Sequence, residues 1–175
     1  LPISIRFRQA AADADADSQA FNTAVYAQDQ MRFGAHWQLI VGLRMDWFDL
    51  DYDNNRSGVR TSEDFSALTP RAGLIYNPID TVSLYAAYSE SYVPRAGEQL
   101  ASLTPANANL DPESFENAEL GVKWQINDWL FTSLALYRLN RGNVAVTDPD
   151  DPGRFLLIDA QRNQGLEWEI TGNLT

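Results

Sequence analysis

Apolar and polar residues alternate with a period of two along most of the chain, which is the spacing of a β-strand. The clearest example lies between His36 and Tyr52, where every second residue is apolar over six positions. A tryptophan stands at each end of this apolar series, at Trp37 and Trp47. Six positions at this period cover about eleven residues, the length that a strand tilted by about 45° needs to cross hydrocarbon.

Two further alternating runs predict a hairpin, from Ser66 to Tyr76 and from Val82 to Val93. Residues 77–81 between them include Pro78, whose φ is fixed, and an aspartate, which can bond to its own local backbone. We therefore expect these five residues to form the turn of the hairpin.

The same period predicts additional strands at residues 21–33, 117–126, 129–141 and 166–174. With these, the chain is expected to form about eight antiparallel strands. The connections are short near Gly34, Pro78 and Asn127, and long at residues 53–63, 95–114 and 142–163. Short turns on one rim and long loops on the other are typical of an outer-membrane β-barrel, so we predict an all-β, antiparallel transmembrane barrel segment.

Alternation also assigns side chains to the two faces of the predicted sheet. In residues 129–141, the odd-numbered side chains form the cleaner apolar face. The opposite, polar side of the sheet should face an aqueous lumen. The charged residues that we assign to this lumen are Arg71, Glu119, Lys123 and Arg138.

Composition excludes several classes of protein. The 175 residues contain no cysteine, so neither a disulfide framework nor a cysteine-based zinc site is possible. The net charge of -11 argues against a nucleic-acid partner, whose phosphates need a basic surface. Five tryptophans and seven tyrosines suit the aromatic girdles of a membrane barrel.

Two features invite a metal or catalytic interpretation, and each has a simpler one. Asp13, Asp15 and Asp17 supply oxygen ligands, but the segment lacks the glycine turn and terminal glutamate of a calcium loop, so we expect a solvated loop. His36 is the only histidine and lies beside a short turn, where a rim position explains it. We predict no metal site, no catalytic residue and no enzyme activity.

Several linked phrases resemble the barrel hairpins of TonB-dependent siderophore receptors. They occur in order from about residue 20 onward, which makes the resemblance specific. The phrases are TPRAGLIY at 69–76, VSLYAAYSESY at 82–92 followed by Pro94, LDPE at 110–113, FEN at 115–117, ELGVK at 119–123, YRLNR at 137–141 and GLE at 165–167.

This resemblance implies that residues 1–175 are part of a barrel of about 22 strands whose lumen holds a globular plug. It implies a receptor in the bacterial cell outer membrane, surrounded by outer-membrane lipid, with a ferric siderophore as the transported ligand and no covalent cofactor. Transport would depend on the TonB complex, which acts through the plug and a TonB box. We expect the plug, the signal peptide and the C-terminal strands to lie outside this chain.

A ferric siderophore is a bulky, often anionic chelate, so its receptor gains from arginine for charge-assisted hydrogen bonds and from aromatic rings for stacking. Such residues should lie at the rim with the long connections. Each candidate can equally be a solvated loop residue or a member of an aromatic girdle. The candidate ligand-binding residues are Tyr92, Arg95, Gln99, Arg154 and Phe155.

Two other classes of function remain open. Eight strands are enough to close a narrow barrel, so a small outer-membrane barrel with a structural or adhesion role is one alternative. An outer-membrane hydrolase that uses His36 is the other, although no motif supplies the partner residues that catalysis would need.

Overall fold

The computed structural model describes residues 16–94, 111–151, 155–158 and 161–173, without the side chains of Ala16 and Phe155. These residues form β-strands and their connections, and no helix among them is long and apolar enough to span a membrane. The strands are β1 (Ala16–Phe33), β2 (Trp37–Asn54), β3 (Val59–Ile79), β4 (Val82–Val93), β5 (Glu113–Asn127), β6 (Leu130–Gly142), β7 (Val144–Thr147), β8 (Phe155–Ile158) and β9 (Gln161–Gly172).

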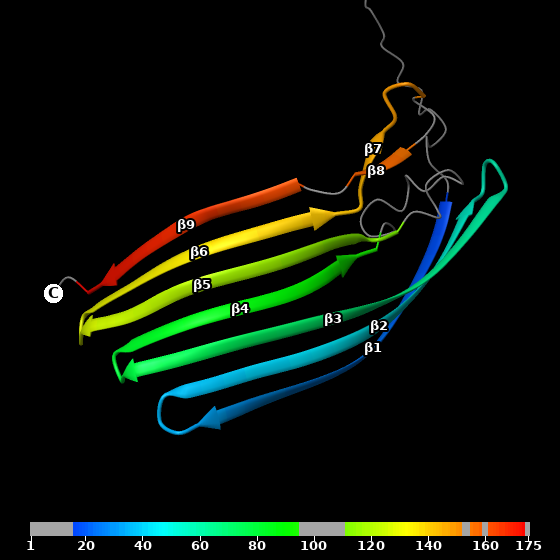
Figure 1. The fold of residues 1–175 in the computed structure, drawn as a ribbon. Helices are drawn as coiled ribbons and strands as arrows, with labels where there is room; N and C mark the ends of the chain where they lie inside the picture. The colour runs from blue at the N-terminus through cyan, green and yellow to red at the C-terminus, as the bar shows by residue number, and fades with distance from the viewer. Residues whose placement is uncertain (1–15, 95–110, 152–154, 159–160, 174–175) are drawn as a thin grey trace, which may run out of the picture.

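Seven of the strands form one antiparallel sheet in the order β1-β2-β3-β4-β5-β6-β9, and β7 pairs with β8 in a separate ribbon. Figure 1 shows a single curved layer with the three short turns at one end and the β7–β8 ribbon at the other. Within the described residues β1 and β9 are not paired with each other, so the sheet is open. The prediction of an all-β antiparallel sheet is confirmed, with seven strands in the layer.

The connection between β2 and β3 is much shorter than predicted. Residues 53–63 were expected to form a loop, but only residues 55–58 leave the ladder, and the paired ends of β2 and β3 project beyond β4 (Figure 1). Gly58, with a φ of 68°, donates its N–H to the carbonyl of Asn54 at 2.8 Å. The polar residues beside this turn pair across the strands, as in the ion pair of Arg60 with Asp53 at 3.1 Å, because ladder hydrogen bonds do not require apolar side chains.

Other predicted boundaries are also wrong: β1, β5 and β9 begin at Ala16, Glu113 and Gln161, before the predicted residues 21, 117 and 166. Asn77 and Pro78 belong to β3, at an irregularity in its pairing with β4, so that only residues 80 and 81 form the turn. Asp17, expected in a solvated loop, lies in β1, whereas Asp13 and Asp15 lie outside the described residues. The connection at 142–163 contains β7 and β8.

The two faces of the sheet differ in chemistry. We call the side of Trp37, Val41 and Trp47 the apolar face, and the opposite side the polar face. Trp37 is 43% and Val41 38% exposed, so neither packs against an opposing sheet. Only four hydrophobic residues are buried in the described part of the chain. A large, exposed and continuous apolar face is what a sheet surrounded by lipid requires.

The face assignment of β6 is the reverse of the prediction. Leu134 pairs with Val122 and Trp168, which places the even-numbered residues of β6 on the apolar face. Arg138 is therefore on the apolar side, whereas Glu119 pairs with Tyr137 on the polar face. Arg71 and Lys123 also lie on the polar face, as predicted. The leucines of β6 decide its orientation because cross-strand partners share a face.

Glycines on the polar face accommodate large side chains from the neighbouring strand. A Cβ at Gly121 would lie 2.5 Å from Cζ of Tyr85, and a Cβ at Gly165 would lie 2.9 Å from the hydroxyl of Tyr137. The hydroxyl of Tyr85 donates to the carboxylate of Glu119. The glycines thus let these tyrosines lie flat against the next strand.

The pairing of β3 with β4 ends at Arg71 and Ser89, although both strands continue. The N–H of Asn77 donates to the carbonyl of His36. Successive residues of a strand direct their backbone groups to opposite neighbours, so the odd-numbered residues of β3 hydrogen-bond to β2 and the even-numbered residues point toward β4. Pro70 is even-numbered and has no N–H, so it removes the next ladder bond. Figure 1 shows β3 and β4 diverging beyond this point.

We predict that Gly121→Ala destabilises the protein by roughly 1–3 kcal/mol, because the added methyl displaces the ring of Tyr85. Gly73→Ala is the matched control, since its Cβ would meet no atom closer than 3.9 Å. Urea unfolding of the full-length protein measures both. In a Tyr85→Ala background the Gly121→Ala cost should disappear; an unchanged cost would refute the contact.

We also predict that Pro70→Val extends the β3–β4 ladder by one bond. One hydrogen bond contributes a net of about 0.5–1.5 kcal/mol to stability. The amide hydrogen of the new valine should therefore exchange with solvent up to roughly tenfold more slowly than the hydrogen of an unpaired amide. Hydrogen exchange measures this, with the amide of Leu68, which also faces the β4 side without a partner in the described ladder, as the internal reference. Equal rates at residues 68 and 70 would contradict the prediction.

Candidate functional site

Two adjoining hollows lie where β3 and β4 part. The larger has a volume of about 580 Å³ and the smaller about 210 Å³, and both are lined by Arg44, Thr69 and Ser91. Arg44 and Thr69 are cross-strand partners on the polar face. The gap that Pro70 opens in the ladder thus coincides with a recessed site that several polar side chains line.

Arg44 is held in place by Asp46. Its Nε and Nη2 donate to the two carboxylate oxygens of Asp46, both at 2.7 Å, in a bidentate pair. The two residues are two positions apart on β2 and therefore share a face. Because this ion pair fixes the guanidinium, Arg44 offers its remaining donors to the hollow in a defined direction.

Arg71 provides a second guanidinium in the larger hollow. Its side chain lies across Gly42, where a Cβ would be 2.7 Å from its Nε. Among the described residues no acidic side chain pairs with it. Tyr26, which is 67% exposed, and Ser89 line the same hollow. Two arginines, a phenol and hydroxyl groups can donate several hydrogen bonds to an anion here, beside the carboxylate of Glu90, which also lines the hollow.

Tyr92 is the predicted ligand-binding residue whose side chain the structure describes. It lines the smaller hollow, and its hydroxyl lies 3.5 Å from Glu90, which also accepts a hydrogen bond of 2.6 Å from Tyr88. Pro94 lines the same hollow. Tyr92 is thus adjacent to the site, and its contact with a ligand stays a prediction.

The other predicted ligand-binding residues are not brought into this site. Arg95, Gln99 and Arg154 lie outside the described residues. Phe155 begins β8, opposite Thr147, but its side chain is not described. Their roles remain predictions.

His36 occupies the rim with the short turns. Its Nδ1–H donates to the carbonyl of Asn77 at 2.7 Å, and its ring packs edge-on against Tyr76. No serine or carboxylate contacts it within the described part of the chain, so the structure adds no support for a hydrolase. No group of three or more His, Asp or Glu residues in that part is arranged to hold a metal ion.

Sequence reasoning missed Arg44, Asp46, Tyr26 and Thr69 as site residues. Two signals were available in the printed sequence. An arginine and an aspartate two positions apart on a strand share a face, and a proline inside a strand marks an interrupted ladder. Together they point to the polar face of β2 and β3 next to Pro70.

A family model and several known proteins match this chain. The model described as TonB dependent receptor-like, beta-barrel matches residues 3–175. The metal-pseudopaline receptor CntO of Pseudomonas aeruginosa is 32% identical over 92% of this chain and 22% of its own length. The catecholate siderophore receptor Fiu of Escherichia coli K12 is 25% identical over 93% of this chain and 25% of its own length. The chain thus spans about a quarter or less of these relatives.

Solved structures give the same result. The ferric-catecholate import receptor Fiu of Escherichia coli superposes with a TM-score of 0.79 over 93% of this chain and 27% of the receptor, at 25% identity. The siderophore receptor PiuA of Acinetobacter baumannii superposes with a TM-score of 0.78 over 92% of this chain and 24% of the receptor, also at 25% identity. The open, seven-stranded layer is accordingly a segment of a larger outer-membrane barrel, and this chain belongs to the TonB-dependent receptor β-barrel family.

Proposed function

We propose that the full-length protein is an outer-membrane receptor that takes up a ferric siderophore in a TonB-dependent manner. The observation that carries this proposal is the superposition of the sheet on receptors for ferric siderophores over nine-tenths of the chain. In this proposal, residues 1–175 contribute barrel wall. A plug with its TonB box, elsewhere in the polypeptide, couples the receptor to the TonB complex.

The polar face is suited to an anionic chelate. Arg71 has no acidic partner in the described part, and Arg44 is oriented by Asp46, so that two guanidiniums project from neighbouring strands. In a water-filled lumen each contributes little to tight binding, but together they favour negative charge along the wall. We assign tighter contacts to the rim residues Tyr92, Arg95, Gln99, Arg154 and Phe155.

A second candidate ligand is a metal complex other than a ferric siderophore. The metal-pseudopaline receptor CntO shows 32% identity, compared with 25% for the catecholate receptor Fiu. Both ligands are metal chelates, and the described wall residues do not discriminate between them. Competition binding between the two kinds of chelate distinguishes these candidates.

Binding of ferric catecholate, ferric hydroxamate and metal-pseudopaline complexes to the full-length receptor tests the proposal. We expect a ferric siderophore to bind and to be taken up only when TonB is present. Tighter binding of the pseudopaline complex would establish the second candidate instead. Binding of none of these chelates would refute both.

Arg95→Ala should weaken binding of the preferred chelate by about tenfold or more, because a hydrogen bond to a charged group contributes about 1.5–3 kcal/mol. Arg60→Ala is the matched control: Arg60 lies beside the β2–β3 turn and is paired with Asp53. Unchanged affinity of the Arg95 variant would remove this residue from the proposed contacts while leaving the receptor function intact.

A further inference from the structure

The larger hollow begins where the pairing of β3 with β4 ends. Arg71 and Ser89 are the last cross-strand pair, and both line the hollow. We call the space between the two strands beyond this pair the β3–β4 gap. The hollow, of about 580 Å³, is lined from both sides of the gap. The lining residues there are Thr69 and Pro70 of β3 and Glu90 and Ser91 of β4.

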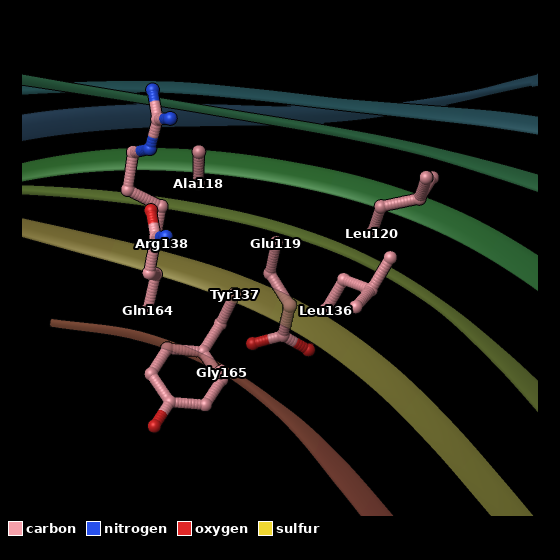
Figure 2. Close-up of a pocket in the computed structure, with 8 residues that line it drawn as sticks. All are labelled: Ala118, Glu119, Leu120, Leu136, Tyr137, Arg138, Gln164 and Gly165. Carbon is pink, nitrogen blue, oxygen red and sulfur yellow. The ribbon is translucent and has the colours of Figure 1, made fainter.

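An intact part of the wall shows what the gap changes. A hollow at β5, β6 and β9 is also lined by residues of both faces. Figure 2 shows the side chains of Glu119 and Tyr137 projecting to one side of the sheet there, and those of Leu120 and Leu136 projecting to the other. These residues pair across a continuous ladder, so hydrogen-bonded backbone separates the two faces. No described pair of β3 and β4 provides this separation beyond the end of their ladder.

The two ends of the hollow in the β3–β4 gap differ in chemistry. On the polar face it is lined by the guanidinium groups of Arg44 and Arg71. On the apolar face it is lined by Leu43 and Pro70, which are cross-strand partners, and Leu43 is 47% exposed. Leu68, 50% exposed, lies in the next row of the apolar face. The hollow therefore joins a cationic surface on the lumen side to an apolar surface on the lipid side.

We propose that the chelate bound at this site carries an acyl chain, which leaves the lumen through the β3–β4 gap. The anionic head of the chelate accepts hydrogen bonds from Arg44 and Arg71, and the chain lies against Leu43 and Leu68. Passage of the chain from the aqueous lumen to the apolar face removes it from water. The inference rests on the proposed receptor function and adds the chemical class of the ligand, an amphiphilic metal chelate.

The shape of the gap allows a chain to enter it from the side of the long connections. In the described residues, β3 and β4 stay unpaired from Pro70 and Glu90 to the ends of the strands at that rim. Figure 1 shows the two strands diverging in this direction. The chain can therefore move into the gap sideways as the head descends, and it does not have to thread through closed backbone.

The charges beside the gap favour a chelate over a membrane phospholipid as the source of the chain. Glu90 lies on the apolar side of β4, where it accepts a hydrogen bond of 2.6 Å from the hydroxyl of Tyr88. Its cross-strand partner is a second carboxylate, Glu116. A phospholipid with its chain on Leu43 would place its phosphate on the same side of the sheet as these carboxylates, which repel it. An acylated chelate keeps its negative charge beside the arginines.

Binding to the full-length receptor in lipid nanodiscs tests the proposal. The probes are the ferric catecholate, ferric hydroxamate and metal-pseudopaline chelates, each with and without a decanoyl chain. For the head group that the receptor binds, we expect the decanoyl form to bind at least about tenfold more tightly, because about two methylene groups withdrawn from water account for such a ratio. The ratio of the two affinities is the measured quantity.

Two variants locate the chain. Pro70→Val, which extends the ladder into the gap, and Leu43→Ala, which removes apolar contact at its outer end, should each lower the ratio by about threefold or more. Leu74→Ala is the matched control and should keep the parent ratio. Leu74 is 42% exposed on the same face, but it pairs with Ala86 in the intact part of the ladder. Partition of the chain into lipid is the same for all variants and does not affect the comparison.

The outcomes separate this inference from the receptor function. Equal affinity of the decanoyl and unacylated forms would refute the acyl chain and leave the receptor function intact, whereas binding of no chelate in either form would refute both. An unchanged ratio in both Pro70→Val and Leu43→Ala would overturn the route through the gap. A diazirine at the end of the chain should label Leu43 or Leu68. Labelling of these residues by diazirine phosphatidylglycerol, and not by the chelate, would assign the outer end of the hollow to membrane lipid instead.

Discussion

Pairing of backbone groups between strands is the constraint on which the rest of this structure depends. A strand in hydrocarbon has no water to satisfy its N–H and C=O groups, so each must bond to a neighbouring strand. The continuous ladder from β1 to β9 meets this demand over seven strands. Because β1 and β9 each have an unpaired edge among the described residues, this layer needs further strands to close as a barrel.

The ladder also determines which side chains meet lipid. Cross-strand partners share a face, so once Trp37 is assigned to the apolar side, the other paired residues of the seven-stranded sheet follow from the register. Neighbours in sequence can therefore have opposite roles. Tyr137 lies over Gly165 on the polar face, and Arg138 lies at the edge of the apolar face.

Much of this fold could be predicted from alternation alone. The strand at Val82–Val93 was predicted with its observed bounds, and the one between residues 36 and 52 nearly so, whereas β5 begins at Glu113, four residues before the predicted start at residue 117. The errors arose where composition was used in place of pairing. Residues 53–63 look like a loop because they are polar, yet they form a ladder, since backbone bonding is indifferent to side-chain polarity. In β6, leucines and aromatic residues occur on both faces, so that only the register decides between them.

The candidate site was harder to predict because it combines residues from separate strands. Arg44 and Arg71 are 27 positions apart in sequence and meet at one hollow only because β2 and β3 pair in a particular register. A one-residue shift of β3 would turn Arg71 and Thr69 to the lipid side. The contact residues at the rim depend on loop conformation, for which alternation provides no rule.

The interruption of the β3–β4 ladder is also a place with the chemistry to bind a ligand. Pro70 interrupts the ladder, and hollows with two arginines lie beside the interruption. Arg138 places a charge at the margin of the hydrocarbon surface without an acidic partner in the described residues. A regular barrel wall needs neither feature for stability, since an uninterrupted ladder and a wholly apolar face would satisfy lipid and backbone better. The interruption at Pro70 is accounted for if the polar face of the wall interacts with an anionic chelate.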